Sequence, residues 1–233
     1  MQATIEIFQA VGVFVAGLLA RLGIFLGVLA VLVAPALLIA FAGRWASARR
    51  RRALGLRRVG GLLFRPGAWY APGHTWLERR PGGTLEIGLD DLAQRLFPSV
   101  TAVELPRPGT RLARGDVLAR LHGGGRGLSI PAPVAGTVAG VNAAVLRDPA
   151  LVKKDGYGRG WLLALAPADE AFAAFPSGPG AEEFLRAESG RFARFLEDRL
   201  GFAAADGGEL VSPAPWLVGE DGWRTLAAEF LSA

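Results

Sequence analysis

Histidine and carboxylate side chains are the residues of this sequence that could do acid–base or metal chemistry, and few are placed for it. There are two histidines, His74 and His122, and no cysteine. A zinc site needs three or four His, Cys or carboxylate ligands at close spacing, which this pair does not provide. Asp90 and Asp91 are adjacent at the expected start of a helix, where they predict an N-cap rather than an acid–base pair. We therefore predict that the protein is not an enzyme and holds no metal.

The glycine-rich stretch HGGGRG, residues 122–127, could do a different kind of chemistry. Successive backbone N–H groups can cradle an anion, with Arg126 as the counter-charge. The stretch lacks the lysine and Ser/Thr of a phosphate-binding loop and does not lead from a strand into a helix. A simple turn, or a turn that contacts a partner, is the favoured interpretation.

The residues around this stretch predict a mainly β domain. Two short β-like runs flank Pro81–Gly83 and predict a hairpin. Residues 89–97 place apolar side chains at the spacing of one buried helix face. Further short strands follow, separated by turns, as in a small sandwich or barrel. Residues 108–121 also resemble residues 148–165, which predicts a unit with approximate two-fold symmetry.

Motifs over residues 72–175 resemble those of the H protein of the glycine cleavage system, a relative of lipoyl and biotinyl domains. This resemblance implies a flattened β-sandwich of two small sheets with short flanking helices. The motifs that carry it are H-x-W at His74 and Trp76, G-L-D-D-L-A-Q at 88–94, L-P-x-x-G at 105–109, G-D at 115–116, A-P-V-x-G at 132–136, V-N at 141–142 and Y-G-x-G-W-L at 157–162.

The resemblance also implies a lipoyl-bearing lysine, in a tight hairpin eight residues before the proline of A-P-V. That count from Pro133 reaches Gly125, and the family's acidic residue three positions earlier is His122. Arg126 has no primary amine and stays protonated, so it cannot replace the lysine. We predict that no cofactor is bound here. The alternative is modification of Lys153 or Lys154, the only lysines, in the second of the two similar segments.

The first part of the chain is strongly apolar. Residues 22–43 form an uncharged run long enough to cross a bilayer as a helix that contains Pro35. Whether residues 1–20 also span the membrane, lie on it or leave it stays open. Arg21 would be costly at mid-bilayer. It is expected to reach the membrane surface or to meet a partner subunit inside the membrane or at its interface.

Seven arginines follow the apolar run, with no acidic residue among them. Such a cluster stays on the cytoplasmic side, which predicts a single-pass inner-membrane protein with its N-terminus outside and its C-terminal domain in the cytoplasm. The same residues are expected to contact anionic lipid headgroups rather than nucleic acid. They are Arg44, Arg49, Arg50, Arg51, Arg52, Arg57 and Arg58, with Trp45 as an interfacial anchor.

Four regions are thus expected: an N-terminal apolar segment (1–43), a basic juxtamembrane linker (44–71), the β domain (72–175) and a helical C-terminal extension (176–233). In the extension, residues 181–200 and 221–231 predict helices with apolar faces. These faces must pack on the chain's own domain or on a partner.

The function predicted from these features is that of a non-catalytic, membrane-anchored structural or docking subunit. It would belong to a larger membrane complex, respiratory or photosynthetic, with other membrane-protein subunits as partners. Two alternatives stay open. One is a lipoyl-type carrier, or a docking protein for lipoate-dependent enzymes. The other is a membrane-fusion-type adaptor, which the charge bias and the lack of heptads disfavour.

Overall fold

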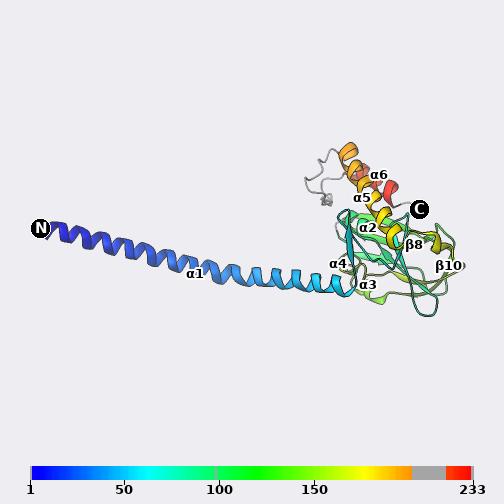
Figure 1. Ribbon diagram of the computed structural model, residues 1–233, viewed down its shortest axis with the longest axis horizontal. Helices are drawn as coiled ribbons and strands as arrows, with labels where there is room; N and C mark the ends of the chain where they lie inside the picture. The colour runs from blue at the N-terminus through cyan, green and yellow to red at the C-terminus, as the bar shows by residue number, and fades with distance from the viewer. Residues whose placement is uncertain (1, 98, 201–218, 232–233) are drawn as a thin grey trace. The chain divides into compact units, whose positions relative to one another are not determined.

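The computed structural model describes residues 2–97, 99–200 and 219–231, and the chain forms two compact units, Met1–Ala53 and Leu54–Ala233. The first unit is one helix, α1 (Gln2–Ala53), which contains Pro35 (Figure 1). Its side chains from residue 12 to residue 50 are exposed. By length and composition, Gly12–Ala53 could cross a membrane.

Residues 44–71, expected as a linker, have regular structure instead. The predicted span, residues 22–43, lies within α1. The helix continues past Arg44 and Arg49–Arg52 to Ala53, because Arg and Ala are good helix formers. Beyond it lie three strands, β1 (Arg57–Val59), β2 (Leu62–Phe64) and β3 (Trp69–Ala71). Val59, Leu62 and Phe64 are buried, so this segment belongs to the core of the second unit.

The second unit is built on two sheets and a small ribbon, as the sandwich prediction requires. A six-stranded sheet has the order β3-β4-β5-β11-β10-β7, a three-stranded sheet has the order β6-β8-β9, and β1 pairs with β2. The remaining strands are β4 (Thr75–Arg79), β5 (Leu85–Leu89), β6 (Ala102–Glu104), β7 (Arg111–Leu112), β8 (Val117–Gly123), β9 (Arg126–Pro131), β10 (Gly136–Val141) and β11 (Leu163–Pro167).

Short helices flank the sheets. They are α2 (Asp91–Leu96), α3 (Ala143–Arg147), α4 (Leu151–Lys154) and the 3₁₀ turn η1 (Ala171–Ala174). The predicted cap at the start of α2 is confirmed: the carboxylate of Asp90 accepts a hydrogen bond of 2.9 Å from the backbone N–H of Ala93. The predicted hairpin around Pro81–Gly83 is also confirmed, as β4 pairs with β5.

The expected two-fold similarity is wrong in detail. Residues 108–121 form β7 and β8, whereas residues 148–165 form α4 and then β11. In the second segment the backbone N–H of Lys154 donates to the carbonyl of Ala150, which closes a helical turn. The two segments are therefore similar in sequence but different in structure.

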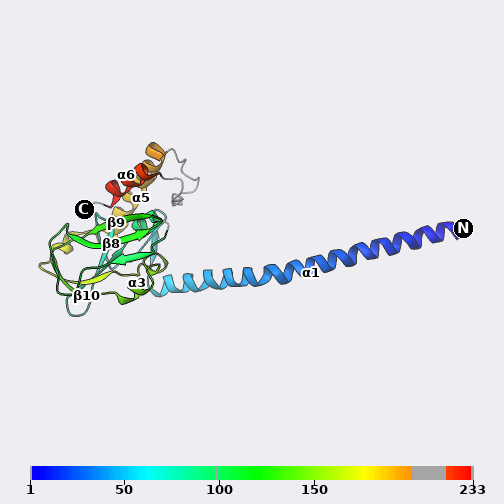
Figure 2. The same cartoon turned by 180° about the vertical axis from the view of Figure 1, so that it is seen from behind.

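The C-terminal helices pack on their own domain, which answers the question left open by the sequence. They are α5 (Gly178–Leu200) and α6 (Glu220–Phe230), drawn in orange and red in Figures 1 and 2. Helix α5 contacts β1 and β3, and Trp223 of α6 contacts Arg126 of β9. Their buried apolar side chains are Ala181, Leu185, Phe192 and Leu196 from α5 and Trp223, Leu226 and Phe230 from α6.

Candidate functional site

The hairpin between β8 and β9 is the feature that the sequence singles out. Gly123 pairs with Arg126, so Gly124 and Gly125 alone form the turn. Their φ angles are +61° and +77°. Two-residue hairpins of type I′ need positive φ at both central positions, where glycine carries no steric penalty. The position that resembles a cofactor attachment site is thus the second residue of a tight two-glycine turn.

The side chains next to the turn belong to a surface pair and an aromatic contact. Nε2 of His122 lies 3.0 Å from Oε1 of Glu104 on the neighbouring strand β6, and both side chains are exposed. On the other side of the turn, the guanidinium carbon of Arg126 lies 5.2 Å from the ring centre of Trp223 in α6. The hairpin therefore presents an imidazole and a guanidinium, and neither can form the amide that holds lipoate.

The two lysines of the chain lie elsewhere, in α4. The Nζ of Lys153 donates to the backbone carbonyl of Phe97, and partial burial lowers the pKa of this amine. Lys154 is exposed in the last turn of the same helix. Neither amine is held on a hairpin turn. The residues at the hairpin turn therefore do not fit the attachment of a swinging lipoyl arm, and both lysines lie away from the position that the resemblance implies.

The predicted basic site residues fall in both compact units. Arg44 and Arg49–Arg52 lie near the end of α1, and the guanidinium carbon of Arg49 is 5.5 Å from the ring centre of Trp45. Arg57 and Arg58 lie in β1, where Arg57 approaches Glu182 of α5 at 3.8 Å. Arg21 lies within the apolar part of α1. Arg57 thus forms an exposed, long ion pair with α5, a contact that sequence did not suggest.

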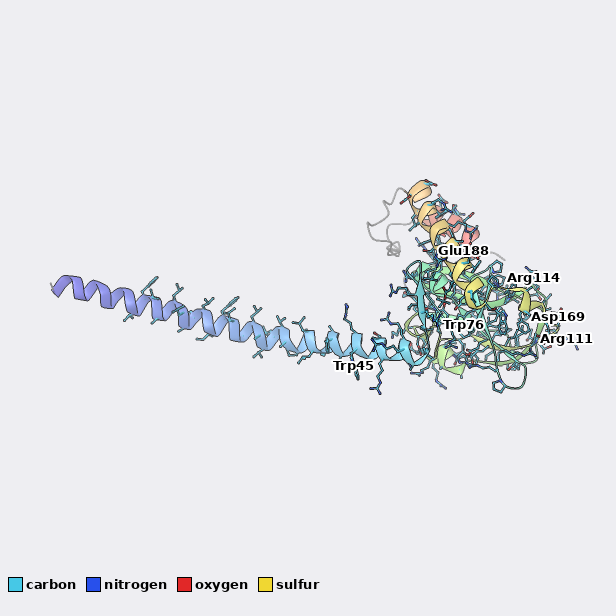
Figure 3. The ribbon with its side chains drawn as sticks, in the orientation of Figure 1. Trp45, Trp76, Arg111, Arg114, Asp169 and Glu188 are labelled. Carbon is cyan, nitrogen blue, oxygen red and sulfur yellow. The ribbon has the colours of Figure 1, made fainter. Side chains whose placement is uncertain are left out.

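Sequence reasoning missed a buried ion cluster around His74, expected only as a packing residue. The side chain of His74 is fully buried, with Nδ1 2.8 Å from Oδ2 of Asp90 and Nε2 3.3 Å from Oε2 of Glu188. Glu188 is labelled on α5 in Figure 3. Glu188 also pairs with Arg191 at 2.7 Å. The cluster thus joins the β domain, the cap of α2 and helix α5.

The charges of this cluster favour a protonated imidazole. Burial lowers the pKa of His74, but the charge of Asp90 and the contacts with Asp90 and Glu188 outweigh it, and the pKa rises to about 9. Burial raises the pKa of Glu188, yet His74 and Arg191 lower it overall. His74 also has a φ of +56°, unusual for a residue other than glycine. No local sequence pattern could indicate that Glu188 pairs with His74, because the two residues are far apart in the chain.

Together, the two sheets and the tight hairpin define a β-sandwich domain of the lipoyl type. The family model for the glycine cleavage H-protein matches residues 68–177. The chain is 37% identical over 100 residues to the glycine cleavage system H protein of Shewanella loihica, covering 43% of this chain and 78% of that one. It is 35% identical over 102 residues to the H protein of Cronobacter sakazakii, covering 44% and 79%. The chain therefore belongs to the glycine cleavage H-protein family.

A solved structure gives a further comparison. The H protein of Mycobacterium marinum is 26% identical, and the match covers 45% of this chain and 87% of that chain with a TM-score of 0.43. The sequence matches leave out α1 and most of the C-terminal extension. These two parts are what this chain has in addition to the shared domain.

Proposed function

We propose that the protein is a non-catalytic, membrane-anchored docking subunit whose H-protein-like domain carries no lipoyl group. The observation that supports this most strongly is the hairpin, where Gly124 and Gly125 form the turn and no amine is available. The domain keeps the sheets and the core of its family while lacking the group through which a carrier acts. Binding is the function left to such a domain.

The proposed membrane anchor rests on α1. An exposed apolar helix of this length is unfavourable in water, since burial of apolar surface is the main driving force of folding. The arginines at its end favour a cytoplasmic position for the folded domain. The apolar faces of α5 and α6 are already buried against the chain's own domain. The surfaces left for partner subunits are therefore α1, with Arg21, and the exterior of the domain.

Two measurements test the anchored docking role. The first is mild solubilisation of native membranes, followed by identification of what co-purifies; stable membrane-protein companions are expected, and a lone monomer would exclude a docking subunit. The second is protease treatment of sealed inside-out and right-side-out vesicles. Cleavage of the folded domain is expected only where the cytoplasmic face is exposed. Cleavage from the outer face would instead favour the adaptor of the membrane-fusion type.

The second candidate function is a lipoyl carrier, and the feature that keeps it open is the exposed amine of Lys154. A carrier modified there would gain the mass of a lipoyl group. The variant Lys154→Arg would then lose that mass, while Lys153→Arg would keep it. If neither lysine is modified in the native protein, the carrier function is excluded.

We expect that Gly125→Lys alone does not restore lipoylation. A lysine at this position would have to adopt a φ of +77°, which L side chains rarely do, and its neighbours are His122 and Arg126 rather than an acidic and an apolar residue. The check is incubation with a lipoyl ligase and lipoate, followed by intact-mass measurement. An authentic H protein serves as the positive control. A lipoylated Gly125→Lys chain would show that the hairpin is much closer to a working site than we propose.

A further inference from the structure

Helix α6 is held on the domain by side chains from three elements that are distant in the sequence. Its Trp223 packs edge-on against Phe97 at 5.3 Å between ring centres, and the guanidinium of Arg126 lies over the same indole. Its Phe230 packs against two rings of α5, at 5.3 Å and 5.4 Å. We call the surface beneath it the α6 seat, made of Phe97, Arg126, Arg191, Phe192 and Phe195.

The contact has the form by which proteins bind an amphipathic helix in trans. Trp223, Leu226 and Phe230 are buried at spacing i, i+3 and i+7, which places them on one face of an 11-residue helix. The aromatic and apolar contacts of α6 with the domain are made by side chains, and the guanidinium of Arg191 also donates to the backbone carbonyl of Glu229. Within residues 2–97, 99–200 and 219–231, no strand pairs with α6.

An arginine of the seat covers an aromatic ring of α6 at each end of the helix. Arg126 covers Trp223, and Arg191 covers Phe230 with its guanidinium carbon 4.6 Å from the ring centre. Near Phe230, the carboxylate of Glu229 also lies 3.5 Å from Arg191, whereas Asp221 in the first turn of α6 pairs with Arg224 of the same helix. A helix that fits the seat therefore has two aromatic residues that meet Arg126 and Arg191, and an acidic residue that pairs with Arg191.

The geometry points to the α6 seat as a helix-binding site, closed in cis by α6 and open to an acidic, aromatic-bearing helix of a partner protein when α6 is displaced. This inference deepens the proposed docking function and rests on it. The seat includes Arg126 of the β8–β9 hairpin, so the binding surface adjoins the turn that has no attachment residue. An isolated helix of this length is only marginally stable in water, so α6 depends on the seat for its structure.

The test uses the full-length chain in detergent and a fluorescent peptide of residues 219–231 as the probe. Three chains are compared: the wild type, W223A/F230A, which weakens the cis helix, and R224A, a control on the solvent side of α6 whose side chain is 70% exposed. We expect W223A/F230A to bind the peptide at least about tenfold more tightly than the other two, because a cis occupant reduces the fraction of open seat. A peptide with Trp223→Ala should not bind.

Equal binding by wild type and W223A/F230A, or binding by neither, would overturn the inference. A concentration-dependent wild-type dimer that the peptide dissociates would overturn it in favour of exchange of α6 between two copies. Hydrogen exchange on the wild type tests the same inference without any variant, and so does not depend on whether W223A/F230A folds. The backbone amides of α6 should exchange well before those of β4 and β5. Equal protection of α6 and these strands would contradict a displaceable helix. Absence of native companions would remove the docking function without changing the peptide result.

Discussion

Replacing His74 by Asn is expected to lower the free energy of unfolding of the folded unit by about 3 to 5 kcal/mol, the range for breaking a buried ion pair from one side. The substitution leaves Asp90 buried, and Glu188 part-buried, without the cation between them. Asn tolerates the left-handed backbone conformation that His74 adopts. The loss of unfolding free energy is therefore due to the missing positive charge and not to backbone strain. The measurement is urea denaturation of the full chain in detergent, followed by tryptophan fluorescence.

The second histidine provides a matched control. His122 pairs with Glu104 on the surface, with 41% and 60% of the two side chains exposed. His122→Asn is therefore expected to change the free energy of unfolding by less than about 0.5 kcal/mol. Comparable losses for His74→Asn and His122→Asn would mean that the buried cluster does not hold α5 on the domain.

The same cluster predicts how stability depends on pH. The folded pKa of His74, about 9, lies above its ordinary value of 6.5. The folded state therefore keeps a proton that the unfolded chain releases, so the stabilisation is complete below pH 6.5 and is lost as the pH rises through 9. The loss amounts to at most about 3 kcal/mol. This pH dependence should be absent from His74→Asn and retained in His122→Asn.

Replacing Trp76 by Ala is expected to cost about 3 to 5 kcal/mol of unfolding free energy, as for other buried aromatic residues. Trp76, labelled in Figure 3, is fully buried in β4. Its ring stacks on Tyr157 at 5.8 Å, and its Nε1 donates to the carbonyl of Gly156 at 3.2 Å. The matched control is Trp45→Ala: this tryptophan lies in α1 with 58% of its surface exposed, and no effect on the folded unit is expected.

A double-mutant cycle makes the Trp76 result specific. A Cβ added at Gly88 would lie 2.6 Å from the indole, so Gly88→Ala should cost roughly 1 to 3 kcal/mol by overpacking. In the Trp76→Ala background the methyl group has room, and most of that cost should disappear. Additive losses would show that Gly88 and Trp76 do not constrain one another.

Local patterns predicted those parts of the fold whose interactions are close in sequence. The hairpin around Pro81–Gly83 and the cap formed by Asp90 need only neighbouring residues. The β1–β2 hairpin was not predicted, although Gly60 and Gly61 stand between two apolar runs as a hairpin turn requires. The neighbouring arginines favoured the interpretation of this segment as a solvated linker.

Contacts between distant segments could not be predicted in this way. Nothing in the local sequence around His74 indicates that Glu188 of α5 approaches its Nε2. The apolar stripe of α6 predicted that the helix is covered, but not that Arg126 of the β8–β9 hairpin covers Trp223. The candidate site was located by counting back from Pro133, and its real surroundings come from the packing of the extension.

The intact mass of the protein purified from its native membranes tests the loss of the lipoyl group most directly. We expect the mass of the unmodified protein, with no lipoyl addition on any residue of this sequence. An authentic H protein from the same cells should carry the lipoyl mass, which shows that the modifying enzymes are active. A lipoyl addition on this chain, located by peptide mapping to Lys153 or Lys154, would contradict a non-lipoylated docking subunit and establish a carrier.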